Sequence, residues 1–417
     1  MRYLKDISIK RGKIKKMLEQ INLQKQNSIF NFSEKFVLEQ ERSVLNENPE
    51  WKSLPKNMNN KLHTICSYMA MFPPSLPYYF INKYSKIGDT ILDPFSGRGT
   101  TILEACLLNR LGIGNDLNPL AFLLTKAKSN VPLKSSVFRR IHFLEKKFGK
   151  TINKIDVSKE EPNIRMIFND YTLKQLVFLK NNLKINQSNV DAFIAALVVG
   201  IIHGGSEGYL SLKMPNTFSM APNYVKNYID QHRLTKPKRD TFSLLKKKLE
   251  RCYQRPLQRG KVYRQDAKKI TRVKDSSIDL VMTSPPYTRV IKYGQFNWIR
   301  LWFLGENCKE VDKDLFFSQS IPKYCSFMTA VLKEMKRVLK SGAKAILVIG
   351  DVKDRETEKI FNLAEIIFER CAQPLGFNLI GEIQPDLISD DTKVSKIWGK
   401  KRGNATKIDR ILVLEKI

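Results

Sequence analysis

The feature that most constrains the fold is a strand, a glycine-rich turn and a helix encoded in residues 89–101. The segment reads Asp89-Thr90-Ile91-Leu92-Asp93-Pro94-Phe95-Ser96-Gly97-Arg98-Gly99-Thr100-Thr101, and an apolar helical pattern continues beyond it. Gly97 and Gly99 let a ligand approach the backbone closely, and the start of the helix favours a carboxylate. The G-x-G spacing lacks the third glycine of the dinucleotide fingerprint, which disfavours NAD. This unit predicts a nucleotide-binding α/β sheet.

A second strand that ends in an acid follows this unit. Gly112-Ile113-Gly114-Asn115-Asp116 predicts a strand whose terminal carboxylate lies about 20 residues beyond the glycine turn, the position from which an acid holds ribose hydroxyls. Pro119 then predicts the first turn of another helix, with Asn118 as its N-cap.

Another apolar run, Ile278 to Met282, predicts a buried strand that stops at Thr283-Ser284-Pro285-Pro286-Tyr287. Neither proline has an N–H to donate, so the ladder cannot continue and carbonyls there stay free to accept hydrogen bonds. Free acceptors beside the flat ring of Tyr287 suit the amino group and the face of a nucleobase turned out of its helix. A Pro-Pro turn that closes a strand against a packed tyrosine is an equally good interpretation of this stretch alone.

Together the two stretches resemble the amino-methylating DNA methyltransferases, which move a methyl group from S-adenosylmethionine to N4 of cytosine or N6 of adenine. The resemblance implies that the D-P-F-x-G-x-G-T stretch binds the methionine half of the cofactor, that Asp116 binds its ribose, and that the S-P-P-Y loop is catalytic. The cofactor-binding residues implied for the first stretch are Asp93, Pro94, Phe95, Ser96, Gly97, Gly99 and Thr100, and the catalytic residues implied for the second are Ser284, Pro285, Pro286 and Tyr287.

Further segments are similar to the same family. Tyr68 to Tyr84 looks like the helix before the cofactor loop, and Val338 to Gly342 is similar to the L-K-P-G-G turn before the fifth strand, with Ser341 in place of the usual proline. Lys261 to Asp266 predicts a third strand, and Asp266 matches the acid that reaches the cofactor's adenine in similar enzymes.

The expected fold is a doubly wound, Rossmann-like methyltransferase sheet, mostly parallel, that ends in an antiparallel hairpin of residues 376–383 and 410–414. Residues 1–60 are expected to form a basic helical arm, residues 61–130 and 259–417 the catalytic domain, and residues 131–258 a largely helical insertion. Basic stretches and the polar loop between Gly204 and Ser219 favour DNA target recognition by this insertion. A helical cap over the sheet edge is the nearly equal alternative.

The charge of the chain supports a polyanionic partner. Its 417 residues include 72 Lys and Arg against 41 Asp and Glu, a formal net charge of +31, which predicts a polyanionic partner, with a lysine-rich bias of the whole proteome as the alternative. The resemblance implies that this partner is duplex DNA. Six scattered cysteines and four histidines predict neither disulfides nor a metal site. The first residues lack the apolar core of a signal peptide and no run is long enough to span a membrane, so we expect a cytoplasmic protein.

The identity of the target base follows from the catalytic loop. Carbon-5 cytosine methylation uses a cysteine after a proline, and no Pro-Cys pair occurs here. A serine at the first catalytic position resembles N4-cytosine enzymes more than the D-P-P-Y loop of many N6-adenine enzymes. We therefore expect N4-cytosine first, N6-adenine second and an RNA base third. A non-catalytic nucleic-acid-binding protein is a different class of hypothesis, against which the intact motifs argue.

Expectations about the reaction and its partners complete the hypothesis. Methyl transfer would be a direct in-line displacement without a metal, by a monomer, and a cognate restriction endonuclease is the further partner that this role implies. Tyr293 is the best candidate among nearby aromatics for the pocket of the flipped base, and residues 398–403, with Lys400, Lys401 and Arg402, are expected to contact phosphates.

Overall fold

The computed structural model describes residues 53–55, 58–287, 292–318, 320–353, 360–383 and 409–417. The expected basic arm up to residue 52 and the expected phosphate contacts at residues 398–403 therefore lie outside the described residues.

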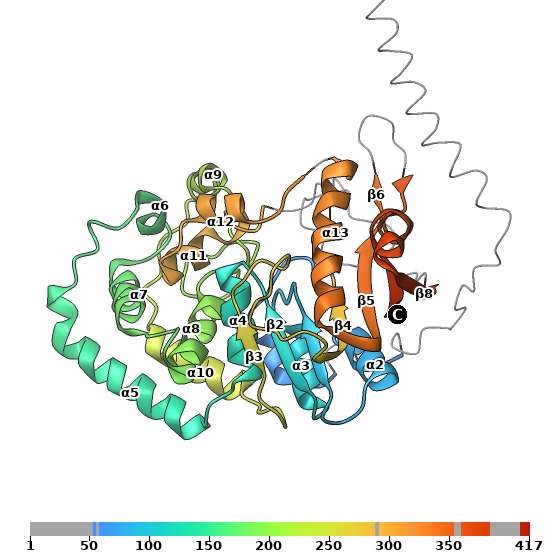
Figure 1. The fold of residues 1–417 in the computed structure, drawn as a ribbon. Coiled ribbons are helices and arrows are strands. Elements are labelled where there is room, and N and C mark those ends of the chain that lie inside the picture. The colour runs from blue at the N-terminus through green and yellow to red at the C-terminus, as the bar shows by residue number, and fades with distance from the viewer. Residues whose placement is uncertain (1–52, 56–57, 288–291, 319, 354–359, 384–408) are drawn as a thin grey trace, which may run out of the picture. The chain divides into compact units, whose positions relative to one another are not determined.

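The centre of the fold is a seven-stranded sheet in the order β3-β2-β1-β4-β5-β9-β8 (Figure 1). Strands β1 to β5 pair in parallel, whereas β9 is antiparallel to both β5 and β8. The bounds are β1 Thr90–Asp93, β2 Leu111–Asn115, β3 Lys261–Tyr263, β4 Ile278–Thr283, β5 Leu339–Gly350, β8 Phe377–Ile383 and β9 Asp409–Lys416, with a separate pair of β6 Val352–Lys353 and β7 Ile360–Phe361. The predicted doubly wound sheet with an antiparallel end is confirmed.

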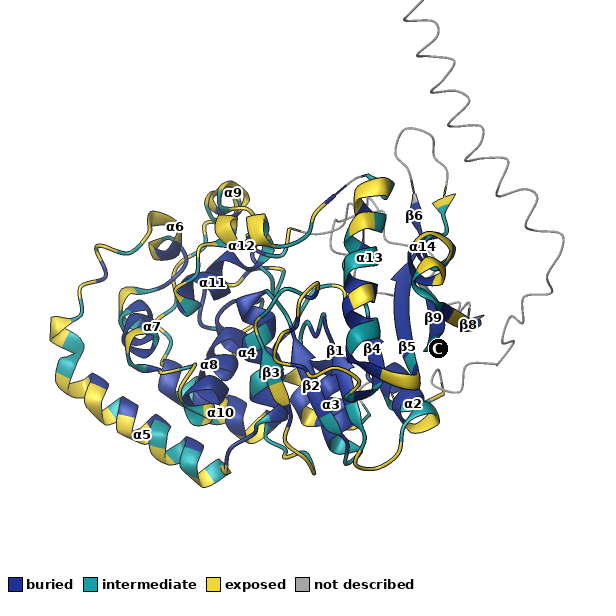
Figure 2. Ribbon diagram, viewed as in Figure 1, coloured by how far each residue is buried: buried dark blue, intermediate teal, exposed yellow. Residues whose placement is uncertain are grey.

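Helices cover both faces of the sheet because alternate strand residues point to opposite sides. Ile91 and Leu280 belong to a buried core that includes side chains of α2 and α3, whereas the next residues, Leu92 and Val281, belong to a core that includes α13 and α14. The buried strands of Figure 2 lie between these layers. The bounds are α2 Ser75–Tyr84, α3 Thr100–Leu107, α13 Ile321–Val338 and α14 Leu363–Ile367.

The segment between β2 and β3 is helical, as predicted. Its helix α8 is buried along almost its whole length, as expected for the apolar run from Ala192 to Ile202. The insertion shares one core with α4 and α11. The bounds are α4 Pro119–Ser129, α5 Lys134–Thr151, α6 Pro162–Arg165, α7 Asp170–Asn182, α8 Asn189–Ile201, α9 Pro222–His232, α10 Thr241–Cys252, α11 Trp298–Leu304 and α12 Cys308–Asp314, with short helices η3 Lys61–Thr64, η4 Ile152–Lys154 and η5 Gln295–Asn297.

Local boundaries differ from the pattern in two places. The third strand ends at Tyr263, so Arg264 and Gln265 lie outside it and Asp266 begins a turn that is closed by the bond from the Lys269 N–H to the Asp266 carbonyl. The helix expected from Phe361 to Cys371 is broken into α14, the π-helix η6 Phe368–Ala372 and the 3₁₀ turn η7 Gln373–Leu375. Pro119 does open α4, and the Asn118 side chain caps it by accepting from the Leu120 N–H. Within the described ranges, we find no helix with the length and apolarity needed to cross a membrane.

Candidate active site

The two sequence motifs meet at the carboxyl ends of neighbouring strands. β1 and β4 pair in parallel through Ile91 with Leu280 and Leu92 with Val281, so Asp93 and Thr283 end side by side. The Thr283 hydroxyl donates to Asp93 Oδ1 over 2.6 Å, and both residues are buried. The strand order reverses between β1 and β4, which is where open α/β sheets form their ligand crevice. Sequence reasoning had given Thr283 no role, because its partner depends on strand pairing.

Asp116 organises the glycine loop. Its Oδ2 accepts from the Gly97 N–H at 2.8 Å and its Oδ1 from the Asn118 N–H at 2.9 Å. Gly97 and Gly99 have φ values of +50° and +76°, a region that favours glycine. A Cβ on Gly99 would lie 2.8 Å from Thr125, so this glycine also lets the loop pack on α4.

The site places two carboxyl groups at the ends of β1 and β2. Burial raises the pKa of Asp93 to about 7, opposed by hydrogen bonds from the Thr283 hydroxyl and the Phe95 N–H. Burial likewise raises the pKa of Asp116 to about 6, opposed by the N–H groups of Asn118 and Gly97. Each carboxylate would gain from a nearby cation, so the pair suits a ligand with positive charge and hydroxyl groups. Asp116 and Gly97 are partly exposed, as a ligand contact requires.

The other residues of the D-P-F-x-G-x-G-T stretch shape the loop. The Ser96 hydroxyl pairs with that of Thr125 at 3.0 Å, and the Thr100 hydroxyl accepts from Arg98 Nε at 3.1 Å. Phe95 is partly buried, with its ring 6.0 Å from that of Phe327. These side chains contact the protein, so a ligand would meet mainly the backbone here. Pro94 is buried beside them.

Asn115 joins three loops at this edge of the sheet. This fully buried side chain donates to the Pro94 carbonyl at 3.3 Å and to the Gln265 carbonyl at 2.9 Å, and accepts from the Gln265 N–H. The turn that carries Asp266 is thereby fixed beside the glycine loop. Asp266 itself is partly exposed and pairs with the Lys268 ammonium at 3.2 Å. Asn115 was part of the predicted second strand, but the sequence gave no sign of this bridging role.

The S-P-P-Y loop is held by a chain of hydroxyl groups. The Tyr287 hydroxyl donates to the Val348 carbonyl of β5 at 3.2 Å, and the Ser284 and Tyr287 hydroxyl oxygens are 3.1 Å apart. A tyrosine hydroxyl has one proton, and Val348 takes it, so Ser284 must be the donor to Tyr287. The lone pairs of Ser284 are then available to accept. Pro285 is buried, whereas Ser284, Pro286 and Tyr287 are partly exposed.

Two tyrosines flank the glycine loop. The rings of Tyr68 and Tyr293 stack at 5.8 Å between centroids, and the Tyr68 hydroxyl accepts from Asn118 Nδ2 at 3.1 Å. A Cβ on Gly97 would lie 3.6 Å from the Tyr68 ring. Burial, followed by the nearby Asp116, raises the pKa of both phenols, so they stay neutral. Tyr293, the expected candidate for the base pocket, stacks on Tyr68, whose ring lies next to Gly97.

A family comparison matches the parts of the chain that build this site. The model of a DNA methylase family matches residues 10–126 and 278–386, more than half of the chain and both motifs. The chain belongs to this DNA methylase family. The match leaves out residues 127–277, which hold the helical insertion and Asp266.

Individual relatives match only part of this chain. The Type II methyltransferase M.BsoBI of Geobacillus stearothermophilus is 24% identical over 289 residues, 62% of this chain and 56% of that protein. The Type II methyltransferase M.MvaI of Kocuria varians is 24% identical over 299 residues, 64% of this chain and 63% of that protein. The chain thus spans less than two thirds of the length of either relative. A solved SAM-dependent methyltransferase from Methanosarcina mazei is 14% identical, with 81% of this chain and 97% of that chain covered at a TM-score of 0.32.

Behind the glycine loop, the chain buries a group of ionisable side chains. His63 Nε2 lies 2.6 Å from Glu104 Oε1. Burial, then Lys128 and Arg98, lowers the pKa of His63 to about 2, and burial raises that of Glu104 to about 8. The pair is therefore a neutral carboxyl that donates to a neutral imidazole at pH 7, which agrees with a structural role for His63. Lys128 is completely buried nearby, and burial lowers its pKa well below the usual range.

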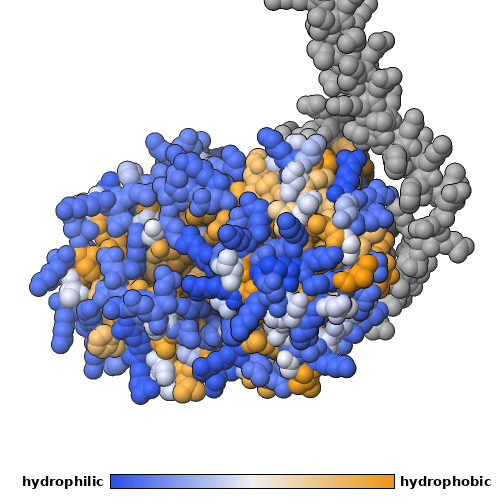
Figure 3. All heavy atoms as spheres, in the orientation of Figure 1, coloured by the Kyte–Doolittle hydropathy of each residue, from blue (hydrophilic) through white to orange (hydrophobic). Residues whose placement is uncertain are grey.

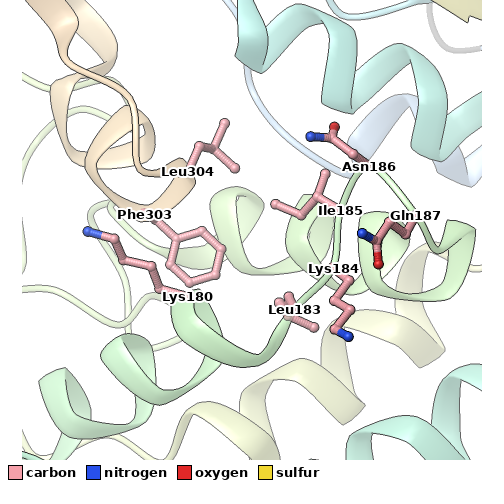
Figure 4. Close-up of a pocket in the computed structure, with 8 residues that line it drawn as sticks. All are labelled: Lys180, Leu183, Lys184, Ile185, Asn186, Gln187, Phe303 and Leu304. Atoms are coloured by element: carbon pink, nitrogen blue, oxygen red, sulfur yellow. The ribbon is translucent and has the colours of Figure 1, made fainter.

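One cavity lies between the helical insertion and α11. It has a volume of about 330 Å³ and lies between the end of α7 and α11 (Figure 4). Its lining contains none of the predicted site residues and consists of Lys180, Leu183, Lys184, Ile185, Asn186, Gln187, Phe303 and Leu304. We assign it no part in the reaction.

Proposed function

We propose that this protein is an S-adenosylmethionine-dependent DNA methyltransferase that methylates an exocyclic amine, with N4 of cytosine in duplex DNA as the leading substrate. The observation that carries the proposal is the bond between Asp93 and Thr283, which joins the glycine loop to the S-P-P-Y loop at the switch point of the sheet. A donor and an acceptor of the methyl group would then lie in one crevice.

The residues present fit S-adenosylmethionine. Asp93 and Asp116 provide two carboxyl groups, the loop between them offers backbone at Gly97, and Asp266 lies on a turn fixed to the same edge. The bound cofactor supplies an electrophilic methyl group on a cationic sulfur. The ionised carboxylates favour that positive charge, and Asp116 can accept from ribose hydroxyls. The methionine half would lie along residues 93–100.

The catalytic loop prepares the amine. The nitrogen lone pair of a base amino group is delocalised into the ring and is a poor nucleophile. Ser284 and the Pro285 carbonyl accept hydrogen bonds from that group, which favours a tetrahedral nitrogen with its lone pair directed at the methyl carbon. Tyr287 stacks on the base and, through Val348, keeps Ser284 an acceptor. Transfer would be a single in-line displacement, in which the N–C bond forms as the S–C bond breaks and the nitrogen then releases a proton to solvent.

The serine at the first position of the loop supports N4 of cytosine as the target. N6 of adenine is the alternative, because both amines present the same geometry to hydrogen-bond acceptors. A modification enzyme of a restriction system is the biological role that we propose, and a cognate endonuclease its natural partner. The high positive charge supports a nucleic-acid substrate.

Product analysis tests this function directly. The pure protein is incubated with S-adenosylmethionine and unmethylated duplex DNA, the DNA is digested to nucleosides, and the products are identified by mass spectrometry. We expect N4-methylcytosine from the wild type and none from Ser284→Ala. N6-methyladenine would keep the mechanism and change the base, whereas a methylated nucleoside from RNA alone would refute the DNA substrate. The absence of a methylated product from both DNA and RNA would refute the proposed methyltransferase activity.

A further inference from the structure

Helix α9 is exposed over most of its length. Across Pro222–His232 only Val225 is buried, with Tyr228 and Ile229 packed partly on the core. The surface around α9 is mainly hydrophilic (Figure 3). A helix of 11 residues that buries so little contributes little to the core, so its exposed face is free for another purpose.

The exposed face of α9 carries a regular row of amides. Asn223, Asn227 and Gln231 are four residues apart, which places them on one side of the helix. All three side chains are exposed, and so is that of Lys226. Among the residues that the structure describes, none of these four side chains has a hydrogen-bond or ion-pair partner.

An aromatic row runs beside the amides and stiffens the helix. Tyr224 stacks on Tyr228 at 6.1 Å, and Tyr228 stacks on His232 at 4.0 Å. Stacked side chains four residues apart stabilise a helix. The amide row therefore lies on a helix that these aromatic stacks stabilise.

The start of α9 is tied to the segment that follows the catalytic loop. The Met220 carbonyl accepts from Trp298 Nε1 at 2.8 Å, and the Ser219 N–H donates to the Phe296 carbonyl at 2.8 Å. The buried Arg300 also donates to the Thr217 carbonyl at 2.6 Å. These bonds fix the start of α9 relative to η5 and α11, which follow the S-P-P-Y loop in the chain.

The chain beyond α9 is basic. Arg233 ends the helix with a φ of +49°, and the exposed Lys236 and Lys238 follow. Such residues match the phosphates that flank a DNA groove.

We propose that α9 enters the major groove of duplex DNA and that Asn223, Asn227 and Gln231 read base edges there. Asparagine and glutamine pair with N6 and N7 of adenine, and the groove is about 12 Å wide, enough for a helix. The recognition sequence should therefore contain A·T pairs beside the target base. The inference rests on the proposed DNA substrate and assigns recognition to α9 rather than to the loop at 204–219, whose Leu210, Ser211 and Leu212 are buried.

The test compares two matched triple variants. The first is Asn223→Ala with Asn227→Ala and Gln231→Ala. The control, Asn181→Ala with Asn189→Ala and Gln258→Ala, removes the same three amides from exposed positions elsewhere. Each protein selects from a library of randomised duplexes, the bound DNA is sequenced, and affinity for one selected and one unrelated duplex is measured against salt. Thermal unfolding checks that both variants fold.

The wild type and the control should enrich one motif that contains A·T pairs. The α9 variant should lose at least about tenfold in preference for it, since each base contact is worth roughly 5- to 150-fold, while its salt-dependent affinity for unrelated DNA persists. The proposal would be overturned if the α9 variant enriched the same motif with equal preference, or if the wild type enriched no motif. It would also be overturned if the control lost as much preference as the α9 variant, or if the α9 variant lost all DNA binding. Motif selection by a wild type that forms no methylated nucleoside would refute the proposed function but leave α9 as the reading element.

Discussion

Replacing Thr283 with valine should weaken cofactor binding by an amount that depends on pH. The hydroxyl lies 2.6 Å from Asp93 Oδ1 with no exposed surface, so valine removes the bond and keeps the shape. A hydrogen bond to a charged group contributes ~1.5–3 kcal/mol, and one pKa unit corresponds to ~1.4 kcal/mol. The pKa of Asp93, about 7 in the wild type, should therefore rise by about one to two units.

This shift fixes the size and direction of the effect. At pH 7 the ionised fraction of Asp93 should fall by about five- to fiftyfold, and affinity for the cationic cofactor with it. Well below pH 7 the ratio of wild-type to variant affinity is largest and constant, because the ionised fraction of Asp93 then changes with pH by the same factor in both proteins. Above the variant's pKa both are ionised, and the ratio approaches one.

The assay is calorimetric titration of S-adenosylmethionine into wild type, Thr283→Val and Thr283→Ser between about pH 6 and pH 9.5, a window around the pKa of Asp93 and its expected rise. Titration of the ligand's own amine cancels in the ratio at each pH. Thr283→Ser keeps a hydroxyl and should follow the wild type. An affinity ratio that does not change with pH would refute the electrostatic reasoning and leave Thr283 a packing residue.

Three further predictions concern single side chains. Tyr287→Phe keeps the aromatic ring but removes the hydroxyl that accepts from Ser284, so the Ser284 hydroxyl can rotate. Single-turnover methylation should slow by roughly 2- to 12-fold, the equivalent of one neutral hydrogen bond. An unchanged rate would contradict the orienting role of Tyr287. Asp116 titrates near pH 6 when folded and lower when unfolded, so it binds its proton more tightly in the folded state, and stability falls as pH rises from about 4 to about 6. In urea unfolding, Asp116→Asn should reduce this dependence of the free energy of unfolding on pH. The same pH dependence in the variant and the wild type would contradict the assignment to Asp116. Lys128→Met replaces a buried amine that has no hydrogen bond among the described residues, and the free energy of unfolding should rise by about 1–3 kcal/mol; a loss in urea unfolding would indicate a role for the amine.

The strands and the cofactor loop could be predicted because local chemistry dictates them. Apolar runs such as 278–282 are buried on both faces, and glycines at positive φ mark the turn after β1. Asn118 and Pro119 began α4 as their capping chemistry required.

What the sequence could not show depends on contacts between distant segments. The bond of Thr283 to Asp93 joins residues 190 positions apart and exists because of the β1–β4 register. The bridge from Asn115 to Gln265 and the tether from Tyr287 to Val348 have the same origin. The stack of Tyr293 on Tyr68 likewise joins residues far apart in the sequence.

The position of the helical insertion also has a physical reason. β3 is the edge strand of the sheet, so chain inserted between α4 and β3 interrupts none of the pairs among β2, β1, β4 and β5. Such an insertion would be remote from the catalytic loop if it folded alone. It instead shares a core with α11, which begins at Trp298, eleven residues beyond Tyr287. Because α11 follows the S-P-P-Y loop and also binds the segment before α9, a displacement of α9 on DNA would act on the chain that leaves the catalytic loop. If α9 reads DNA as proposed, the edge insertion would link recognition to the S-P-P-Y loop and leave the strand pairs of β2, β1, β4 and β5 intact.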